Sequence, residues 1–114
     1  MASARQARGA YGERRAAAWY EQQGFTVVAR NWRDGRAGEL DLVVQRGSLV
    51  VVCEVKARAS DAYGDAEAVT VAKQLRIRRL AGSFLASAGL GRVEVRFDVA
   101  CVTGTHLELF EAAF

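Results

Sequence analysis

Two short apolar segments on either side of Gly47-Ser48 constrain the fold of this chain more than any other feature. The segments read ELDLVVQR and LVVVCEVK, and both carry charged residues at every second position near their outer ends. A glycine-first dipeptide between two such segments is typical of a two-residue type II′ hairpin loop. This loop would place Arg46 opposite Leu49 and so set the pairing of every residue further along both strands.

This register brings two carboxylates together. Asp41 then lies directly across from Glu54, and opposed Cβ atoms in an antiparallel pair are roughly 4.5–5.5 Å apart, where like charges are destabilising. A divalent cation held between the two carboxylates is the simplest compensation. A three-residue loop that included Arg46 would instead send them to opposite faces of the hairpin. The sequence favours the shorter loop without excluding the longer one.

The surroundings of Glu54 favour a functional interpretation of the pair. Charged residues on the wet face of an edge hairpin are common and need no function. However, residues 49–55 read LVVVCEV, which is typical of a central strand covered on both faces. A carboxylate is rarely buried in such a strand unless it is paired. We therefore interpret Asp41 and Glu54 as parts of a site.

Length and composition are those of an ordinary soluble domain. The 114 residues are 51% hydrophobic and 25% charged, and we expect one domain over residues 1–114. There is no apolar run of the roughly 20 residues that span a bilayer and no apolar region of a secretory signal near the start. Cys53 and Cys101 lie in apolar segments and are expected to be small buried hydrophobes. We expect a cytoplasmic protein with reduced thiols and no membrane partner.

Basic residues suggest a nucleic-acid partner by their placement. The net charge is only +3, and all of the sixteen basic residues except Lys56 and Lys73 are arginine. Arginine suits bidentate phosphate contacts, but a genome rich in G and C raises the arginine content equally well. Several basic residues flank the carboxylate hairpin or begin the helix that follows it. The residues expected to contact DNA are Arg33, Arg36, Arg58, Lys73 and Gln74.

Hydrophobic periodicity predicts an α/β fold with a small mixed sheet of about five strands and two main helices. The second helix joins the second hairpin strand to the next strand, and such a βαβ unit makes those two strands parallel. A polar loop at residues 57–68 precedes this helix. The helices are expected at residues 6–23 and 70–88, and the strands at residues 25–31, in the two halves of 38–56, and at 93–101 and 106–110.

Three further polar residues need an interpretation. Glu13 lies on the inward stripe of the first helix, and it either complements the helix dipole or points into the cleft beside Asp41. Glu39 shares a strand face with Asp41, and we expect it to form an ion pair with Lys56 or Arg36. His106 is expected to be an exposed strand residue.

The order of these elements resembles the core of the restriction-endonuclease-like superfamily in its PD-(D/E)xK form. More narrowly, the chain is similar to the YraN-like family of bacterial proteins, which is related in fold to Holliday-junction resolvases. One departure is Cys53, where a large apolar residue is expected. The matching elements are Gly12-Glu13, Asn31-Trp32-Arg33, Gly38-Glu39-Leu40-Asp41-Leu42, Cys53-Glu54-Val55-Lys56-Ala57-Arg58, Tyr63-Gly64, Lys73-Gln74 and Arg96-Phe97-Asp98-Val99.

The resemblance and the residues together suggest a metal-dependent nuclease that acts on DNA, with a preference for branched structures. Asp41 and Glu54 would hold Mg²⁺ or Mn²⁺ with the carbonyl of Val55 and water. Lys56 would orient the attacking water or stabilise the transition state. Glu13 would be a second metal ligand or a proton acceptor. The expected catalytic residues are Glu13, Asp41, Glu54 and Lys56.

Two other classes of function remain open at this point. The chain could be a nucleic-acid-binding module that has kept the fold and lost catalysis, or an adaptor protein that its metal only stabilises. A steep salt dependence of DNA affinity would distinguish the adaptor from the other two. By analogy with the resolvases, a homodimer is expected.

Overall fold

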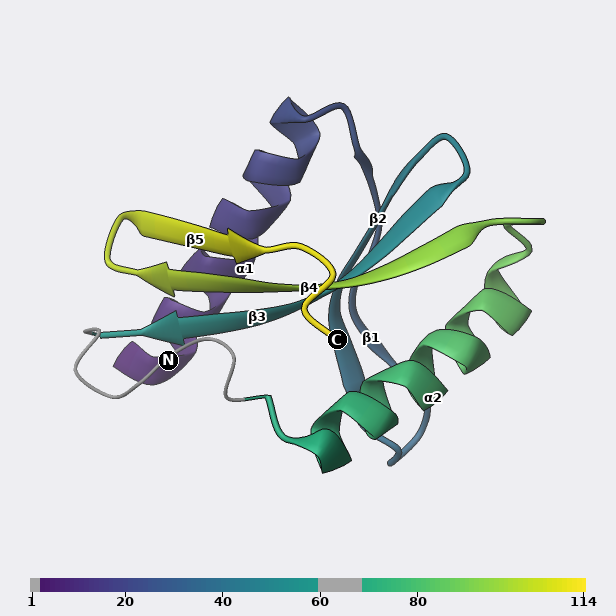
Figure 1. Cartoon of the computed structure of the whole chain (residues 1–114). Helices are drawn as coiled ribbons and strands as arrows, with labels where there is room; N and C mark the ends of the chain where they lie inside the picture. Colours follow the sequence, from purple (N-terminus) through teal and green to yellow (C-terminus); the bar gives the residue numbers. More distant parts are fainter. Residues whose placement is uncertain (1–2, 60–68) are drawn as a thin grey trace.

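A five-stranded mixed sheet with one helix on each face forms the framework of the part of the chain that is described (Figure 1). The structure is a computed structural model, and it describes residues 3–59 and 69–114. The strand order is β1-β2-β3-β4-β5, with β3 and β4 parallel and all other neighbours antiparallel. This confirms the predicted fold class. The elements are α1 (Ala4–Gln22), β1 (Thr26–Arg33), β2 (Glu39–Arg46), β3 (Leu49–Arg58), α2 (Val71–Ala88), β4 (Glu94–Thr103) and β5 (His106–Phe110).

The β2–β3 hairpin has the register that the two-residue loop predicts. Arg46 pairs with Leu49, and the ladder continues without interruption to Leu42 and Cys53. Gly47 has a φ of 60°, as the first central residue of a type II′ turn requires. The three-residue loop is therefore excluded.

The core consists of two layers because β3 is apolar on both sides. Val50 and Val52 belong to the layer under α2, whereas Val51 and Cys53 belong to the layer under α1. This alternation confirms that β3 is a central strand. The helix residues in these layers are Ile77, Leu80 and Phe84 from α2 and Ala16, Ala17 and Tyr20 from α1.

Most of the remaining expectations on local structure hold. Cys53 and Cys101 are buried, and His106 is exposed on β5. The polar loop begins later than predicted, because Ala57 and Arg58 still pair with β4. The rest of that loop, with the Tyr63-Gly64 element, lies outside the described residues. Neither of the helices described here is long and apolar enough to cross a membrane.

The close approach of α1 to the sheet depends on one glycine. A Cβ atom at Gly12 would lie 2.9 Å from the Cβ of Ala57, which is fixed to the backbone and cannot move aside by changing rotamer. We expect Gly12→Ala to lower the free energy of unfolding by about 1–3 kcal/mol in urea titrations, because the helix must shift from the sheet. Gly9→Ala is the matched control. It adds its methyl group to open space on the same helix, so it should stabilise the protein by about 0.5–1 kcal/mol.

Candidate active site

The candidate site lies where β2 separates from β3. The ladder between these strands is paired as far as Leu42 and Cys53, although β2 begins at Glu39 and β3 continues to Arg58. Beyond the last pair the two strands diverge in space (Figure 1). There the carboxylate of Asp41 accepts a hydrogen bond of 2.8 Å from the backbone N–H of Val55. Where the strands separate, the Asp41 side chain thus replaces a backbone carbonyl of the ladder as the acceptor for the Val55 N–H.

Asp41 and Glu54 meet in the gap that opens between β2 and β3 beyond Leu42 and Cys53, as the predicted register requires. Their carboxyl groups are close enough to share a hydrogen bond when one of them is protonated. Burial, followed by the contact with Glu54, raises the pKa of Asp41 to about 8. The side chain of Glu54 is only 8% exposed, and the ammonium of Lys73 lies 3.4 Å from its Oε2 atom. Lys73, at the start of α2, therefore supplies the balancing positive charge.

Glu13 faces the same gap from α1. Burial raises its pKa, and so does the negative charge of Asp41, whereas the side chain of Asn31 lowers it. Because α1 begins at Ala4, Glu13 lies well beyond the first turn and cannot complement the helix dipole there. The structure thus supports the cleft interpretation of Glu13 and not the dipole interpretation.

Lys56 follows Glu54 by two residues on β3, so the two side chains leave the strand on the same face. Lys56 is half-buried and lies opposite Cys101 of β4. Within residues 3–59 and 69–114, no three carboxylate, histidine or cysteine side chains are gathered tightly enough to hold a metal ion. The oxygen donors at the gap are therefore the Asp41–Glu54 pair, with Glu13 nearby and not part of a three-residue cluster.

The predicted ion pair of Glu39 has a different partner. Glu39 lies 3.1 Å from Arg33 and is paired neither with Lys56 nor with Arg36. The reason is that Arg33 is directly opposite Glu39 in the β1–β2 ladder, whereas β2 has already left β3 before Glu39 could reach Lys56. Glu39 therefore forms an ion pair, as predicted, but the predicted partner was wrong.

The other basic and polar residues expected to contact DNA surround the gap in different ways. Arg36 is exposed in the turn between β1 and β2, and Arg58 ends β3. The side-chain amide of Gln74 donates a hydrogen bond of 2.9 Å to the carbonyl of Val69, next to the start of α2. Lys73 contacts Glu54 in this structure, so its charge is directed at the carboxylates.

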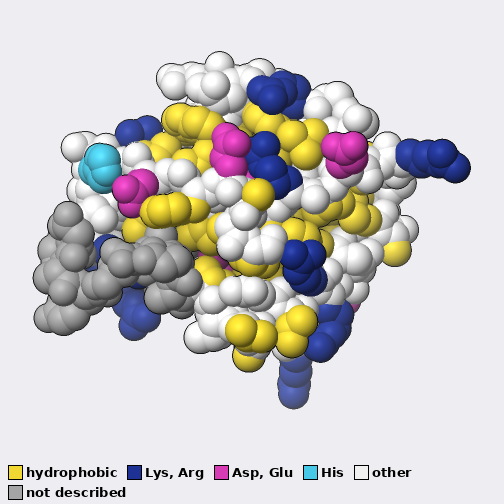
Figure 2. All heavy atoms as spheres, viewed as in Figure 1, with side chains coloured by type: hydrophobic (Ala, Val, Ile, Leu, Met, Phe, Trp, Pro, Cys, Tyr) yellow, Lys and Arg dark blue, Asp and Glu magenta, His cyan; other side chains and the backbone are white. Residues whose placement is uncertain are grey.

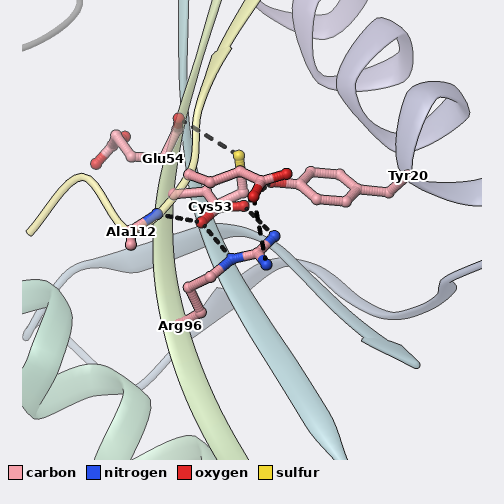
Figure 3. Close-up of polar contacts among 7 residues, drawn as sticks. Tyr20, Cys53, Glu54, Arg96 and Ala112 are labelled. Atoms are coloured by element: carbon pink, nitrogen blue, oxygen red, sulfur yellow. Dashed lines mark hydrogen bonds and ion pairs between the residues drawn. The ribbon is translucent and has the colours of Figure 1, made fainter. Parts of the chain in front are cut away.

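A buried carboxylate, Asp98, lies behind the site. It belongs to the matching element Arg96-Phe97-Asp98-Val99, but the sequence assigned it no role. Asp98, with no exposed surface, accepts hydrogen bonds from the hydroxyl of Tyr20 at 2.6 Å, from the guanidinium of Arg96 and from the backbone N–H of Ala112. Tyr20 reaches this cluster from α1, and Cys53 lies beside it on the strand that carries Glu54 (Figure 3). Burial, then Cys53 and Asp98, raise the pKa of Tyr20, which keeps the phenol protonated as a donor.

This arrangement defines an α/β protein whose fold and carboxylate placement are consistent with the restriction-endonuclease-like superfamily. The chain belongs to the family described as "Uncharacterised protein family UPF0102", whose match covers residues 12–102. All four expected catalytic residues fall within that range.

Several relatives are similar to this chain over most of its length, and each is named "UPF0102 protein". The relative from Beutenbergia cavernae is 50% identical over 104 residues, which are 90% of this chain and 87% of the relative. The relative from Kineococcus radiotolerans is 49% identical over 102 residues, with coverage of 88% and 83%. The relative from Acidothermus cellulolyticus is 40% identical and covers 99% of this chain and 97% of its own length.

The raised pKa of Asp41 predicts how stability depends on pH in protein treated with a chelator. Between about pH 4 and about pH 8 the folded protein keeps a proton on Asp41 that the unfolded chain has released. The free energy of unfolding should therefore fall as the pH rises through this window, by up to about 1.4 kcal/mol per pH unit. Urea titrations across the window would measure this slope.

Asp41→Asn is the variant that isolates this effect. The asparagine oxygen can still accept the Val55 hydrogen bond, but the side chain does not titrate. Its slope should be shallower than that of the wild type, and it should be the more stable protein near pH 8. Equal slopes in the two proteins would contradict the assignment of the raised pKa to Asp41.

Proposed function

We propose that this protein is a divalent-metal-dependent nuclease that hydrolyses phosphodiester bonds in DNA. The observation that supports this most directly is the Asp41–Glu54 pair in the gap between β2 and β3. Two carboxylates in contact and largely buried are destabilising without a positive charge between or beside them. A site that only served stability would have no reason to keep both of them.

The donor set at the gap suits Mg²⁺ or Mn²⁺. Both carboxylates offer hard oxygen atoms, and the N–H and C=O of one strand residue point to the same edge, so the Val55 carbonyl faces this gap as well. Asp41 and Glu54 would hold the ion, with this carbonyl and water completing its coordination. When bound, the ion would lower the pKa of a coordinated water and neutralise charge on the scissile phosphate.

The remaining residues of the gap have roles that follow from their charge. Lys56 presents an ammonium group on the face that carries Glu54, where it can stabilise the negative charge that develops on the phosphate. Glu13, with its raised pKa, is better suited to accept a proton near neutral pH than an ordinary carboxylate. Lys73 balances Glu54 in the metal-free protein, and its side chain is exposed enough, at 43%, to turn to the DNA backbone.

The proposed DNA surface combines α2 with the turn between β1 and β2. The sequence of α2 contains Lys73 and three arginines but no acidic residue, and Arg76 packs against Gly38 in the turn. Basic side chains lie near the beginning of α2, where Val71 and Leu75 also expose hydrophobic surface (Figure 2). Phosphate contacts of this kind provide affinity without base specificity, which suits an enzyme that recognises DNA structure, such as a branch.

The metal and the reaction are tested with three variants. Calorimetric titration with Mn²⁺ should show binding to the wild type and none to Asp41→Asn or Glu54→Gln. Lys56→Ala should keep metal and DNA binding but cleave roughly 10²-fold more slowly, because its contribution is made mainly in the transition state. The substrates are linear, flapped and four-way-junction DNA with each metal.

Two results would overturn this proposal. If the wild-type protein binds DNA but cleaves none of the substrates with either metal, a binding module without catalysis is the better account. If Lys56→Ala cleaves as fast as the wild type, the activity arises at another site or from a contaminant.

The DNA surface is tested through its salt dependence. Neutralising two exposed arginines, in the variant Arg36→Gln/Arg76→Gln, should reduce the slope of log affinity against log salt by about two units. Arg92→Gln is the control, because Arg92 lies near the start of β4, at the end of the sheet opposite to the gap. A slope that changes in the control and not in the double variant would place the DNA surface elsewhere.

A further inference from the structure

Asn31 has an unusual backbone conformation for a residue inside a strand. Its φ is 48°, and among the described residues only Ala112 is another non-glycine with positive φ. Its neighbours Arg30 and Trp32 keep their places in the β1–β2 ladder, opposite Leu42 and Leu40. The distortion is therefore confined to one residue, and that residue lies across from Asp41.

The type of residue at this position is informative. Glycine adopts positive φ without steric cost, and asparagine is among the few other residues that tolerate it. The chain uses asparagine, which adds a side-chain amide at the edge of the gap. Aspartate would have nearly the same shape, but its charge would repel Asp41. Asparagine at this position thus combines a neutral hydrogen-bond donor with a left-handed backbone.

That amide interacts with Glu13 of α1. Glu13 has two unfavourable neighbours in the gap, the negative charges of Asp41 and Glu39. The amide of Asn31 is a neutral donor on the strand next to Asp41, so it can hold the Glu13 carboxylate in place without neutralising either charge. Strain at a single residue that faces a cluster of charges is typical of functional sites.

We propose that Asn31 is the positioning residue for Glu13. Its left-handed backbone directs the side-chain amide toward α1, and the amide holds the Glu13 carboxylate beside Asp41 and Glu54. This inference rests on the proposed function in one respect, which is that Glu13 takes part in the reaction. The contact itself can be measured without any activity.

The first experiment measures the contact by NMR. The side-chain amide resonances of Asn31 should shift by more than the linewidth in Glu13→Gln, and the spectrum of the core should not change. Ala112→Gly, which alters the other left-handed residue, should leave the Asn31 amide where it is. An Asn31 amide that does not move in Glu13→Gln would overturn the proposal, whether or not the protein is a nuclease.

The second experiment separates positioning from a structural role. Asn31→Gly removes the amide and keeps the backbone conformation accessible, so its melting temperature should not fall. Its kcat should fall roughly 10-fold with KM within about 2-fold, because the substrate-binding surface is intact. The Asn31→Gly/Glu13→Gln double variant should be no slower than Glu13→Gln alone, since both changes remove the same contribution.

The kinetic results have clear alternatives. Wild-type kcat in Asn31→Gly, or losses that multiply in the double variant, would overturn the proposal. If the wild-type protein has no nuclease activity, the proposed function fails, and the amide shift in Glu13→Gln alone decides whether Asn31 holds Glu13.

Discussion

The register of the β2–β3 hairpin is the constraint on which both the core and the candidate site depend. Side chains alternate along a strand with a period of two, so a slip of one residue would exchange the two faces of β3. The same slip would separate Asp41 from Glu54. The turn at Gly47-Ser48 therefore determines at once which valines pack under each helix and whether two carboxylates meet. Stability of the core thus protects the geometry of the site.

Asp98 determines the position of α1 on the sheet, through its hydrogen bond with Tyr20. Burying a carboxylate costs several kcal/mol unless hydrogen bonds compensate, and Asp98 has donors from α1, from its own strand and from the segment after β5. Tyr20 follows Glu13 by seven residues, which is two helical turns, so both side chains lie on the same side of α1. The Tyr20–Asp98 hydrogen bond consequently positions Glu13 over the gap, although neither of its partners belongs to the site.

Local sequence patterns predicted most of the fold. The features that were not predicted depend on contacts between distant residues or on signals too weak to recognise. Strand alternation, the helical stripe of α2 and the Gly47 turn all act over a few residues, so they can be recognised in the sequence. The hydrogen bond between Tyr20 and Asp98 cannot be recognised there, because the two residues are 78 positions apart in the chain. The partner of Glu39 depended on where β2 leaves β3, and this point of separation has no sequence signal. The left-handed conformation of Asn31 has only a weak sequence signal, since asparagine is also common at positions with an ordinary backbone conformation.

The carboxylates of the gap can stay close together only because the elements that carry them are held rigidly. When ionised, Asp41, Glu54 and Glu13 repel one another, and this repulsion contributes to the raised pKa of Asp41 and of Glu13. A proton on Asp41 and the 3.4 Å contact of Lys73 with Glu54 relieve part of it. A flexible scaffold would relieve the repulsion by moving the carboxylates apart and into water. Here they stay together because each comes from an element with its own anchor: the β2–β3 ladder holds Asp41 and Glu54, and the Asp98 cluster holds the helix of Glu13. The free energy of the two-layer core therefore maintains an arrangement of like charges that a divalent cation would complete.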